Sequence, residues 1–438
     1  MAAIASTESR TRIQLTAWRN SLFVIFALCG VGLASWAARV PRVGAILDLP
    51  PAQLGLLLLG IAIGSIGGLT ASGHLVSRFG ARVIIVLTLI GSAIGLVLAA
   101  VGTSILVSFT VAFVGLMVFG ACMGACDVAM NVSGAANERA LKRSVMPIYH
   151  AFFSIGTVVG AALGAIAERL DIALPQHIGV LAALIIVLAV IVVRFIPGDD
   201  LASRVSVEPL TETDGVKSGS DDSTAAGPGQ TSAGPATPRG SVWKDPRTVA
   251  IGVIALGMAF AEGTATDWLS YAMVTGHDSS TTTGALVFGV FVAAMTVGRF
   301  VGVALLDRFG RVPVLRTSGI LAVVGLLLFI FVPVFAVTVI GVVLWGLGAS
   351  LGFPVAMSAA ADDPHTAAAR VGAVATIGYI AFLVGPPAIG FIAGQLGILN
   401  ALLLVAVLVT AATMAANAAR APSLRAGMIP PVGADSSR

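Results

Sequence analysis

Long apolar runs separated by short polar stretches dominate the chain, and each run is long enough to form a membrane-spanning helix. About twenty apolar residues cross the hydrocarbon core of a bilayer. Bounding the runs by their charged ends predicts helices at 22–38, 53–75, 83–101, 105–130, 147–167 and 178–196, and then at 249–273, 283–305, 314–331, 335–357, 371–393 and 399–418. The pattern therefore predicts an all-α polytopic membrane protein with twelve transmembrane helices in two groups of six.

The polar gap between the two groups completes the predicted domain organisation. Residues 198–242 are rich in Ser, Thr, Gly, Pro and Asp and contain few large apolar residues. Such a segment cannot bury enough surface to offset the entropy of ordering it. We expect an N-terminal six-helix bundle over 1–197, a disordered linker over 198–242, a C-terminal six-helix bundle over 243–420 and a tail over 421–438.

Composition and charge support a membrane location. The 438 residues are 57% hydrophobic and 11% charged, which excludes an ordinary soluble globular protein. The net charge is +4, and the basic residues that produce it lie in short loops between apolar runs. They therefore indicate membrane topology and not nucleic-acid binding. With the N-terminus inside, the outer loops hold only Arg39, Arg42 and Arg169 among the basic residues. We therefore expect a cytoplasmic-membrane protein with both termini and the linker in the cytoplasm.

A short motif occurs at matching positions of the two halves. GHLVSRFGAR (73–82) follows the second predicted helix, and GVALLDRFGR (302–311) follows the eighth. Glycine can adopt a positive φ in such a tight turn without steric penalty. The positions that we assign to this loop motif are Gly73, Arg78, Gly80, Arg82, Asp307, Arg308, Gly310 and Arg311. The repetition indicates a duplicated fold whose halves are related by an axis along the membrane normal.

Twelve helices with paired Arg-Phe-Gly turns resemble the major facilitator superfamily, over nearly all of the chain except the linker and tails. The resemblance implies a secondary transporter that works by alternating access. The superfamily has an acid before the Arg of the turn. In this chain the second copy of the turn has an acid at that position, Asp307, whereas the first copy has Ser77.

GACMGACDVAMN (120–131) is similar to the fourth helix of proton-coupled fucose permeases. That similarity places Asp127 at the proton-carrying acid and Asn131 at the neighbouring asparagine. SWAARVP (35–41) and EGTATDW (262–268) resemble segments of uncharacterised bacterial permeases.

Asp127 is a candidate functional residue even without the resemblance. It lies in an apolar helix, and Asn131 lies one turn further on the same face. Ionisable groups in spans are energetically unfavourable and are functional by default. The alternative is an acid at the cytoplasmic end of a helix, which either stays solvated or pairs with a loop arginine. Glu262, in the middle of the seventh helix, is the second group that we expect to couple to protons.

Several other polar or aromatic side chains fall near the predicted cavity or its mouths. Asp267 and Trp268 follow Glu262, and they form either part of a substrate site or an interfacial cap with an aromatic anchor. Arg299 interrupts the eighth helix, where it either pairs with an acid across the cavity or extends to the cytoplasmic interface. The residues that we expect to contact substrate are Asn131, Trp36, Arg39, His150, Asp267 and Trp268.

Two of these residues have open alternatives. Arg39 is either a gate ligand or an outer-interface cation, and His150 is either a proton shuttle or a hydrogen-bonded structural residue. Gly385-Pro386-Pro387 should bend or break the eleventh helix, because proline removes a backbone hydrogen bond.

Metal, cofactor and enzymatic chemistry are not predicted. Cys29, Cys122 and Cys126 all lie in apolar runs, so a disulfide framework is unsupported. Cys122 and Cys126 are spaced to hold a soft metal ion, but a pair of small packing residues explains them better. The G-x-S-x-G match at 348–352 lies within an apolar helix and not on a strand-turn-helix elbow.

The sequence thus predicts a monomeric, non-enzymatic transporter that carries out proton-coupled symport of a small, sugar-like polar solute. Its partners would be that solute, protons and the lipid bilayer, with no cofactor, metal or nucleic acid. One alternative is proton-antiport efflux of amphipathic compounds. Another is a membrane sensor that transports nothing, although the linker is too polar to form a structured sensing domain.

Overall fold

The computed structural model describes residues 2–143, 145–197, 242–363 and 366–420, and this part of the chain is built from helices and short connections. The predicted tail and nearly all of the predicted linker lie outside the described residues. The N-terminal half contains α1 (Ala2–Ala37), α2 (Val40–Ile46), α3 (Pro51–Phe79), α4 (Ala81–Ser104), α5 (Phe109–Leu141), α6 (Met146–Arg169), α7 (Leu174–Val192) and η1 (Val193–Phe195). The C-terminal half contains α10 (Pro246–Gly276), α11 (Thr281–Phe309), α12 (Arg311–Phe331), α13 (Phe335–Ala349), α14 (Gly352–Ala360), α15 (Ala367–Leu396), α16 (Ile398–Ala401), α17 (Leu403–Ala415) and η2 (Ala416–Ala419).

The expected all-helical, twelve-span fold is confirmed. Within the described residues, 12 helical stretches are long and apolar enough to cross a membrane. The first of these stretches, Arg12–Ala37, lies within α1. The tenth span consists of α13 and α14, which meet at Ser350 and Leu351.

The fourth span is longer than its apolar run predicted, because α5 continues to Leu141. Polar side chains in this extension are buried and bonded to other helices. Trp18 Nε1 donates to Ser133 Oγ at 3.0 Å, and Tyr149 Oη donates to Asn137 Oδ1 at 2.7 Å. A purely apolar pattern cannot reveal such an extension. Arg139 consequently lies in the last turn of the helix and not in the loop after it.

The paired turns adopt the expected backbone. Gly80 ends α3 with φ of 80°, and Gly310 ends α11 with φ of 77°. These values lie in the region that glycine occupies readily and that a Cβ disfavours. The prediction that the motif forms a sharp turn in each half is therefore confirmed.

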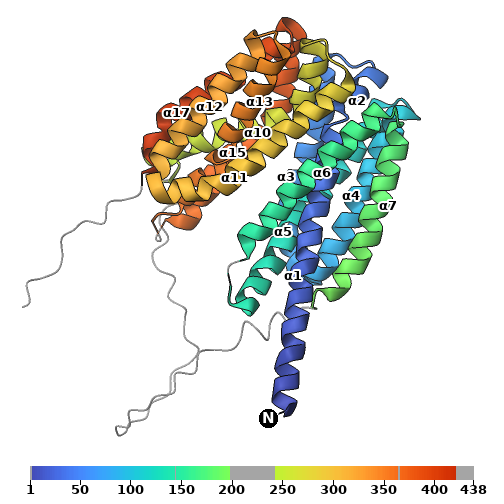
Figure 1. The fold of residues 1–438 in the computed structure, drawn as a ribbon, viewed down its shortest axis with the longest axis vertical. Coiled ribbons are helices and arrows are strands. Elements are labelled where there is room, and N and C mark those ends of the chain that lie inside the picture. Colours follow the sequence, from blue (N-terminus) through green and yellow to red (C-terminus); the bar gives the residue numbers. More distant parts are fainter. Residues whose placement is uncertain (1, 144, 198–241, 364–365, 421–438) are drawn as a thin grey trace, which may run out of the picture.

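Figure 1 shows the two halves side by side, close together near α2 and further apart toward the end where α1 begins. We call these the α2 end and the linker end, because the residues flanking 198–241 lie at the latter. At the α2 end, a Cβ on Gly55 would lie 2.5 Å from the carbonyl oxygen of Pro386, and one on Gly390 would lie 2.5 Å from that of Pro51. The α3 and α15 backbones therefore meet directly, which closes this end. Both prolines of the α15 motif lie inside a continuous helix, so the predicted break does not occur.

Candidate functional site

A cavity of about 1230 Å³ lies at the linker end and includes side chains from both halves. His150 of α6 is its lining residue from the N-terminal half. Its remaining polar side chains are Arg299, Asp307, Arg311, Arg316, Ser350, Ser358 and Arg420. Apolar side chains, among them Val303 and Phe353, cover much of the rest. The cavity is large enough for a small solute and combines apolar walls with a few polar groups, as ligand sites do.

Glu262 of α10 and Arg299 of α11 form an ion pair in which Arg299 Nη2 lies 2.7 Å from Glu262 Oε1. Their side chains are 24% and 30% exposed, so the pair is partly accessible. Arg299 also extends toward the N-terminal half, with its Nη1 3.5 Å from Ser154 Oγ of α6. Arg299 is thus paired with an acid, but that acid belongs to another helix of the same half, and the pair lies beside the contact between the two halves.

Asp127 and Asn131 interact as their spacing predicted. Asn131 Nδ2 donates to the Asp127 carbonyl at 2.8 Å and lies 3.2 Å from Asp127 Oδ1. The Asp127 side chain is exposed, and it is close enough to Tyr379 of α15, in the other half, for an electrostatic interaction. Among the described residues, no ion pair joins Asp127 to an arginine. The structure therefore does not show pairing with a loop arginine, whereas the exposure of Asp127 leaves the solvated alternative open.

Other predicted substrate ligands are enclosed in this conformation. Trp36 and Trp268 are 1% and 0% exposed, and neither indole N–H has a hydrogen-bond partner in the described part of the chain. Asp267 is partly exposed and has no hydrogen bond or ion pair to another described residue. None of the three lines the large cavity.

Arg39 has surroundings that differ from those predicted for a substrate ligand. Its side chain is fully buried, with Nε 2.9 Å from Glu168 Oε1 and Nη2 donating to the Ile172 carbonyl at 2.7 Å. Arg42 pairs with the same Glu168 carboxylate at 3.1 Å. Arg39 therefore ties α2 to the end of α6 within one half, and we leave it out of the proposed site.

Comparison with known proteins identifies the family. The sequence profile described as Major Facilitator Superfamily matches residues 21–299 and 268–426, which together cover most of the chain. The chain belongs to the major facilitator superfamily. It is 30% identical over 371 residues to an uncharacterised MFS-type transporter of Yersinia pestis, covering 84% of this chain and 87% of that protein. It is 27% identical over 388 residues to the membrane protein MosC of Rhizobium meliloti, covering 87% and 84%.

Solved structures agree with this assignment at the level of the fold. A point mutant of the nucleoside transporter NupG superposes with a TM-score of 0.68 at 14% identity, covering 93% of this chain and 99% of that one. A bacterial homologue of the human lysosomal transporter Spinster, in an inward-facing and occupied conformation, gives a TM-score of 0.66 at 14% identity, covering 92% and 96%. The protein is thus a multi-pass membrane transporter of the major facilitator type.

The superfamily's loop motif differs between the halves. Arg78 and Arg308 each stack their guanidinium group on the following phenylalanine ring, at 5.4 and 5.3 Å. Asp307 lines the large cavity, whereas Ser77 donates to the His74 carbonyl at 2.9 Å. Ser77 thus satisfies its hydroxyl within its own helix, where an acid would project a charge. A Cβ on Gly73 would meet nothing within 4 Å, so close packing does not require glycine there. Arg82 lines a small pocket beside Trp18 and Ser133.

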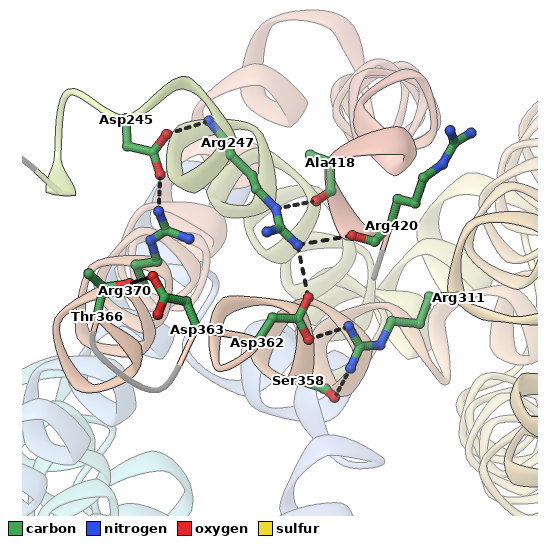
Figure 2. Close-up of polar contacts among 10 residues, drawn as sticks. All are labelled: Asp245, Arg247, Arg311, Ser358, Asp362, Asp363, Thr366, Arg370, Ala418 and Arg420. Atoms are coloured by element: carbon green, nitrogen blue, oxygen red, sulfur yellow. Dashed lines mark hydrogen bonds and ion pairs between the residues drawn. The ribbon is translucent and has the colours of Figure 1, made fainter. Parts of the chain in front are cut away.

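Arg311 of this motif belongs to an ion-pair network at the linker end of the C-terminal half, shown in Figure 2. Asp362 accepts from Arg247 at 2.8 Å and from Arg311 at 2.7 Å, and Asp245 pairs with Arg370 at 3.0 Å. The network joins the beginnings of α10, α12 and α15 at this end of the half.

Asp245 also caps the N-terminus of α10 in this network, accepting from Arg247 N at 3.2 Å. Partial burial would raise the pKa of Asp245. Hydrogen bonds from Thr248 and Arg247, together with the charge of Arg370, outweigh burial and hold that pKa below its usual value.

Sequence reasoning did not select Asp245, Asp362 or Glu168. The signal available for each was an acid beside a helix end that also carries arginines. That pattern is common on solvated helix ends, and only the fold shows which arginine each acid meets.

Proposed function

We propose that this protein is a proton-coupled symporter of a small, sugar-like polar solute, working by alternating access. The observation that supports this most directly is the Asp127 carboxylate, which is exposed within a span and whose one hydrogen-bond partner among the described residues is the amide of Asn131. It interacts electrostatically with Tyr379 of the opposite half and has no ion-pair partner among the described residues. Protonation would remove a charge that the bilayer interior disfavours, so a proton can bind there when the solute does.

Glu262 and Arg299 supply the second half of the proposed coupling. Their ion pair is partly exposed and lies beside Ser154 of the N-terminal half. A solute hydroxyl that competes for Arg299 would release Glu262 and change the electrostatics between the halves. Movement of one half against the other would then follow from solute and proton binding together.

We propose that the protein lies in the cytoplasmic membrane and that its linker end faces the cytoplasm. The structure, with its α2 end closed and its cavity at the linker end, would then be the inward-facing state. In the outward-facing state, opening of the α2 end would expose Trp36, Trp268 and Asp267 to a solute. We propose that these residues, with Asn131 and His150, contact the solute during the cycle, and that the protein functions as a monomer without a cofactor.

A second function, proton-antiport efflux of amphipathic compounds, is favoured by the apolar part of the cavity wall. Val303, Leu306, Phe353 and Met357 all line it. A purely polar solute makes little use of these side chains, whereas an amphipathic compound would bury apolar surface against them.

The test begins with a thermal-shift screen of the purified protein against sugars, polyols, organic acids and tetraphenylphosphonium. A solute that stabilises the protein is then added to proteoliposomes that contain a pH-sensitive dye. We expect a sugar or polyol to drive proton movement, and Asp127→Asn to abolish that movement while solute exchange across the membrane persists.

Asp171→Asn is the matched control, because it removes the same charge from an exposed acid at the α2 end and should behave as wild type. Proton movement in the Asp127→Asn variant would exclude Asp127 as the carrier. Stabilisation by tetraphenylphosphonium alone would favour efflux over symport.

A further inference from the structure

A second cavity, of about 740 Å³, lies at the linker end of the N-terminal half, between α1 and the turn that joins α5 to α6. Four cationic side chains line it: Arg12, Arg19, Lys142 and Arg143. No acidic side chain is among its lining residues in the described part of the chain. Among the described residues, the cavity therefore carries a positive charge that no acid of its lining compensates, in contrast to the ion pairs at the same end of the other half.

The local sequence explains why these cations gather. Arg12, Thr16, Arg19 and Phe23 follow one another at spacings of four, three and four, so they share one face of α1. Because α1 is a continuous helix through these residues, that face forms one wall of the cavity. The Arg19 guanidinium lies 5.5 Å from the centre of the Phe23 ring, which holds the arginine over the apolar part of the cavity.

The opposite wall is formed by the α5–α6 turn. Lys142 adopts a left-handed conformation with φ of 51° and ends α5. Glu138 is the nearest acid on this element, and its Oε2 accepts from the N–H groups of Val145 and Met146, each at 2.6 Å. The carboxylate is thus engaged with the backbone of the turn, and it holds Lys142 and Arg143 in place without entering the cavity lining.

The position of the cavity bears on the chemistry of its ligand. Its cations lie beside the ends of two spans, because α5 ends at Leu141 and α6 begins at Met146. Basic pockets at this level of a membrane protein meet the phosphates of lipid headgroups. Phe23 and Ile148 continue the cavity toward the membrane interior, and Ile148 is 46% exposed. The lining is thus cationic at the surface and apolar below it.

We propose that this cavity binds the phosphate of an anionic phospholipid from the leaflet on the linker side. The phosphate lies among Arg12, Arg19, Lys142 and Arg143, and an acyl chain lies along Phe23 and Ile148. A soluble phosphate compound matches only the cationic part of this lining, whereas a lipid matches both. The bound lipid bridges α1 to the α5–α6 turn, and it is separate from the transported solute.

The experiment measures lipid binding by the full-length protein in neutral detergent, by native mass spectrometry and by thermal shift. Phosphatidylglycerol is compared with phosphatidylcholine, and glycerol 3-phosphate and inorganic phosphate are compared with both. We expect phosphatidylglycerol to bind at least tenfold more tightly than phosphatidylcholine. The two soluble phosphates should neither stabilise the protein nor displace the lipid at equal concentration.

A triple variant, Arg12→Gln with Lys142→Gln and Arg143→Gln, should lose the preference for phosphatidylglycerol. These side chains are exposed, so the variant should keep the wild-type melting temperature in phosphatidylcholine. The matched control, Arg78→Gln with Arg194→Gln and Arg308→Gln, removes three exposed cations from the same end outside this cavity and should keep the preference.

Each other outcome overturns the proposal in a recognisable way. An equal loss of the preference for phosphatidylglycerol in both triple variants would show that the lipid is attracted to the basic face in general and that the cavity is not a specific site. Competition by inorganic phosphate would assign the cavity to a soluble anion. Stronger lipid binding after deletion of 199–241 would mean that the cavity binds the acidic residues of that segment. Binding is read without transport, so failure here leaves the proposed symport unaffected.

Discussion

Arg299 Nη2 of α11 lies 2.7 Å from Glu262 Oε1 of α10, and the same guanidinium reaches to within 3.5 Å of Ser154 Oγ in the other half. One arginine therefore links an ion pair within the C-terminal half to the contact between the halves. Because the pair is only partly exposed, removal of one partner leaves a charge that water does not fully solvate.

We therefore expect Glu262→Gln and Arg299→Gln each to destabilise the protein by roughly 1–3 kcal/mol. The double variant should be less destabilised than the sum of the two, because it leaves no unpaired charge. Thermal unfolding of the wild type, the two single variants and the double variant in one detergent gives the coupling free energy between the two side chains. Additive losses would mean that the two side chains do not interact, and the proposed competition between solute and Glu262 would then lose its basis.

Much of the fold could be predicted because apolar run length and glycine turns are local properties. Runs of about twenty apolar residues specify spans whatever they pack against, and the Gly80 and Gly310 turns depend only on backbone freedom. The extension of α5 could not be predicted, since Ser133 and Asn137 are buried only because Trp18 and Tyr149 meet them.

The candidate site was predictable where its geometry is helical. The Asp127–Asn131 contact follows from a spacing of four on one helix. The partner of Arg299 and the burial of Arg39 depend on which helices are neighbours, and two alternatives for each remained open in the sequence. Trp36 and Trp268 show a further limit, because their exposure depends on which end of the transporter is closed.

Gly390 should control closure of the α2 end. A Cβ there would lie 2.5 Å from the Pro51 carbonyl oxygen of the other half, and backbone cannot move aside as a side chain can. We expect Gly390→Leu to keep this end open. Gly394→Leu is the control, since it lies one turn further on α15 and nothing lies within 4 Å of its Cβ.

The measurement uses a cysteine introduced at Ser270, which is 2% exposed and donates to the Ala38 carbonyl across the interface. Native cysteines are replaced by alanine beforehand. A membrane-impermeant maleimide added from the α2 side should label this cysteine several-fold faster with Gly390→Leu than with Gly394→Leu. Equal rates would show that α3 and α15 do not limit closure.

Glu168 and Asp171 should contribute very differently to stability although both pair with arginines. Glu168 is 1% exposed and faces Arg39, which is fully buried, whereas the side chain of Asp171 is 84% exposed. Glu168→Gln leaves the Arg39 charge buried and unpaired, and we expect a loss of about 3–5 kcal/mol. Asp171→Asn should cost no more than about 1 kcal/mol. Similar melting temperatures for the two variants would mean that water reaches Arg39.

His277 should make stability depend on pH. It follows the last residue of α10, its ring lies 4.9 Å from the Phe329 ring, and its Nε2 is buried without a partner among the described residues. Burial lowers the pKa of His277, while a hydrogen bond to the Phe329 backbone and the charge of Asp278 act in the opposite direction and only partly offset it. The folded state therefore binds a proton less readily than the unfolded state, whose histidine pKa is about 6.5.

The stability that neutral His277 contributes is consequently complete above about pH 6.5 and is lost as the pH falls through the lower pKa of the folded state. We expect the melting temperature to fall between pH 7.5 and pH 5, and to fall less in His277→Gln. His74→Gln replaces an exposed histidine of α3 and should behave as wild type. If all three proteins lose the same number of degrees, acid destabilisation arises elsewhere, because only His277→Gln removes the ring that packs against Phe329.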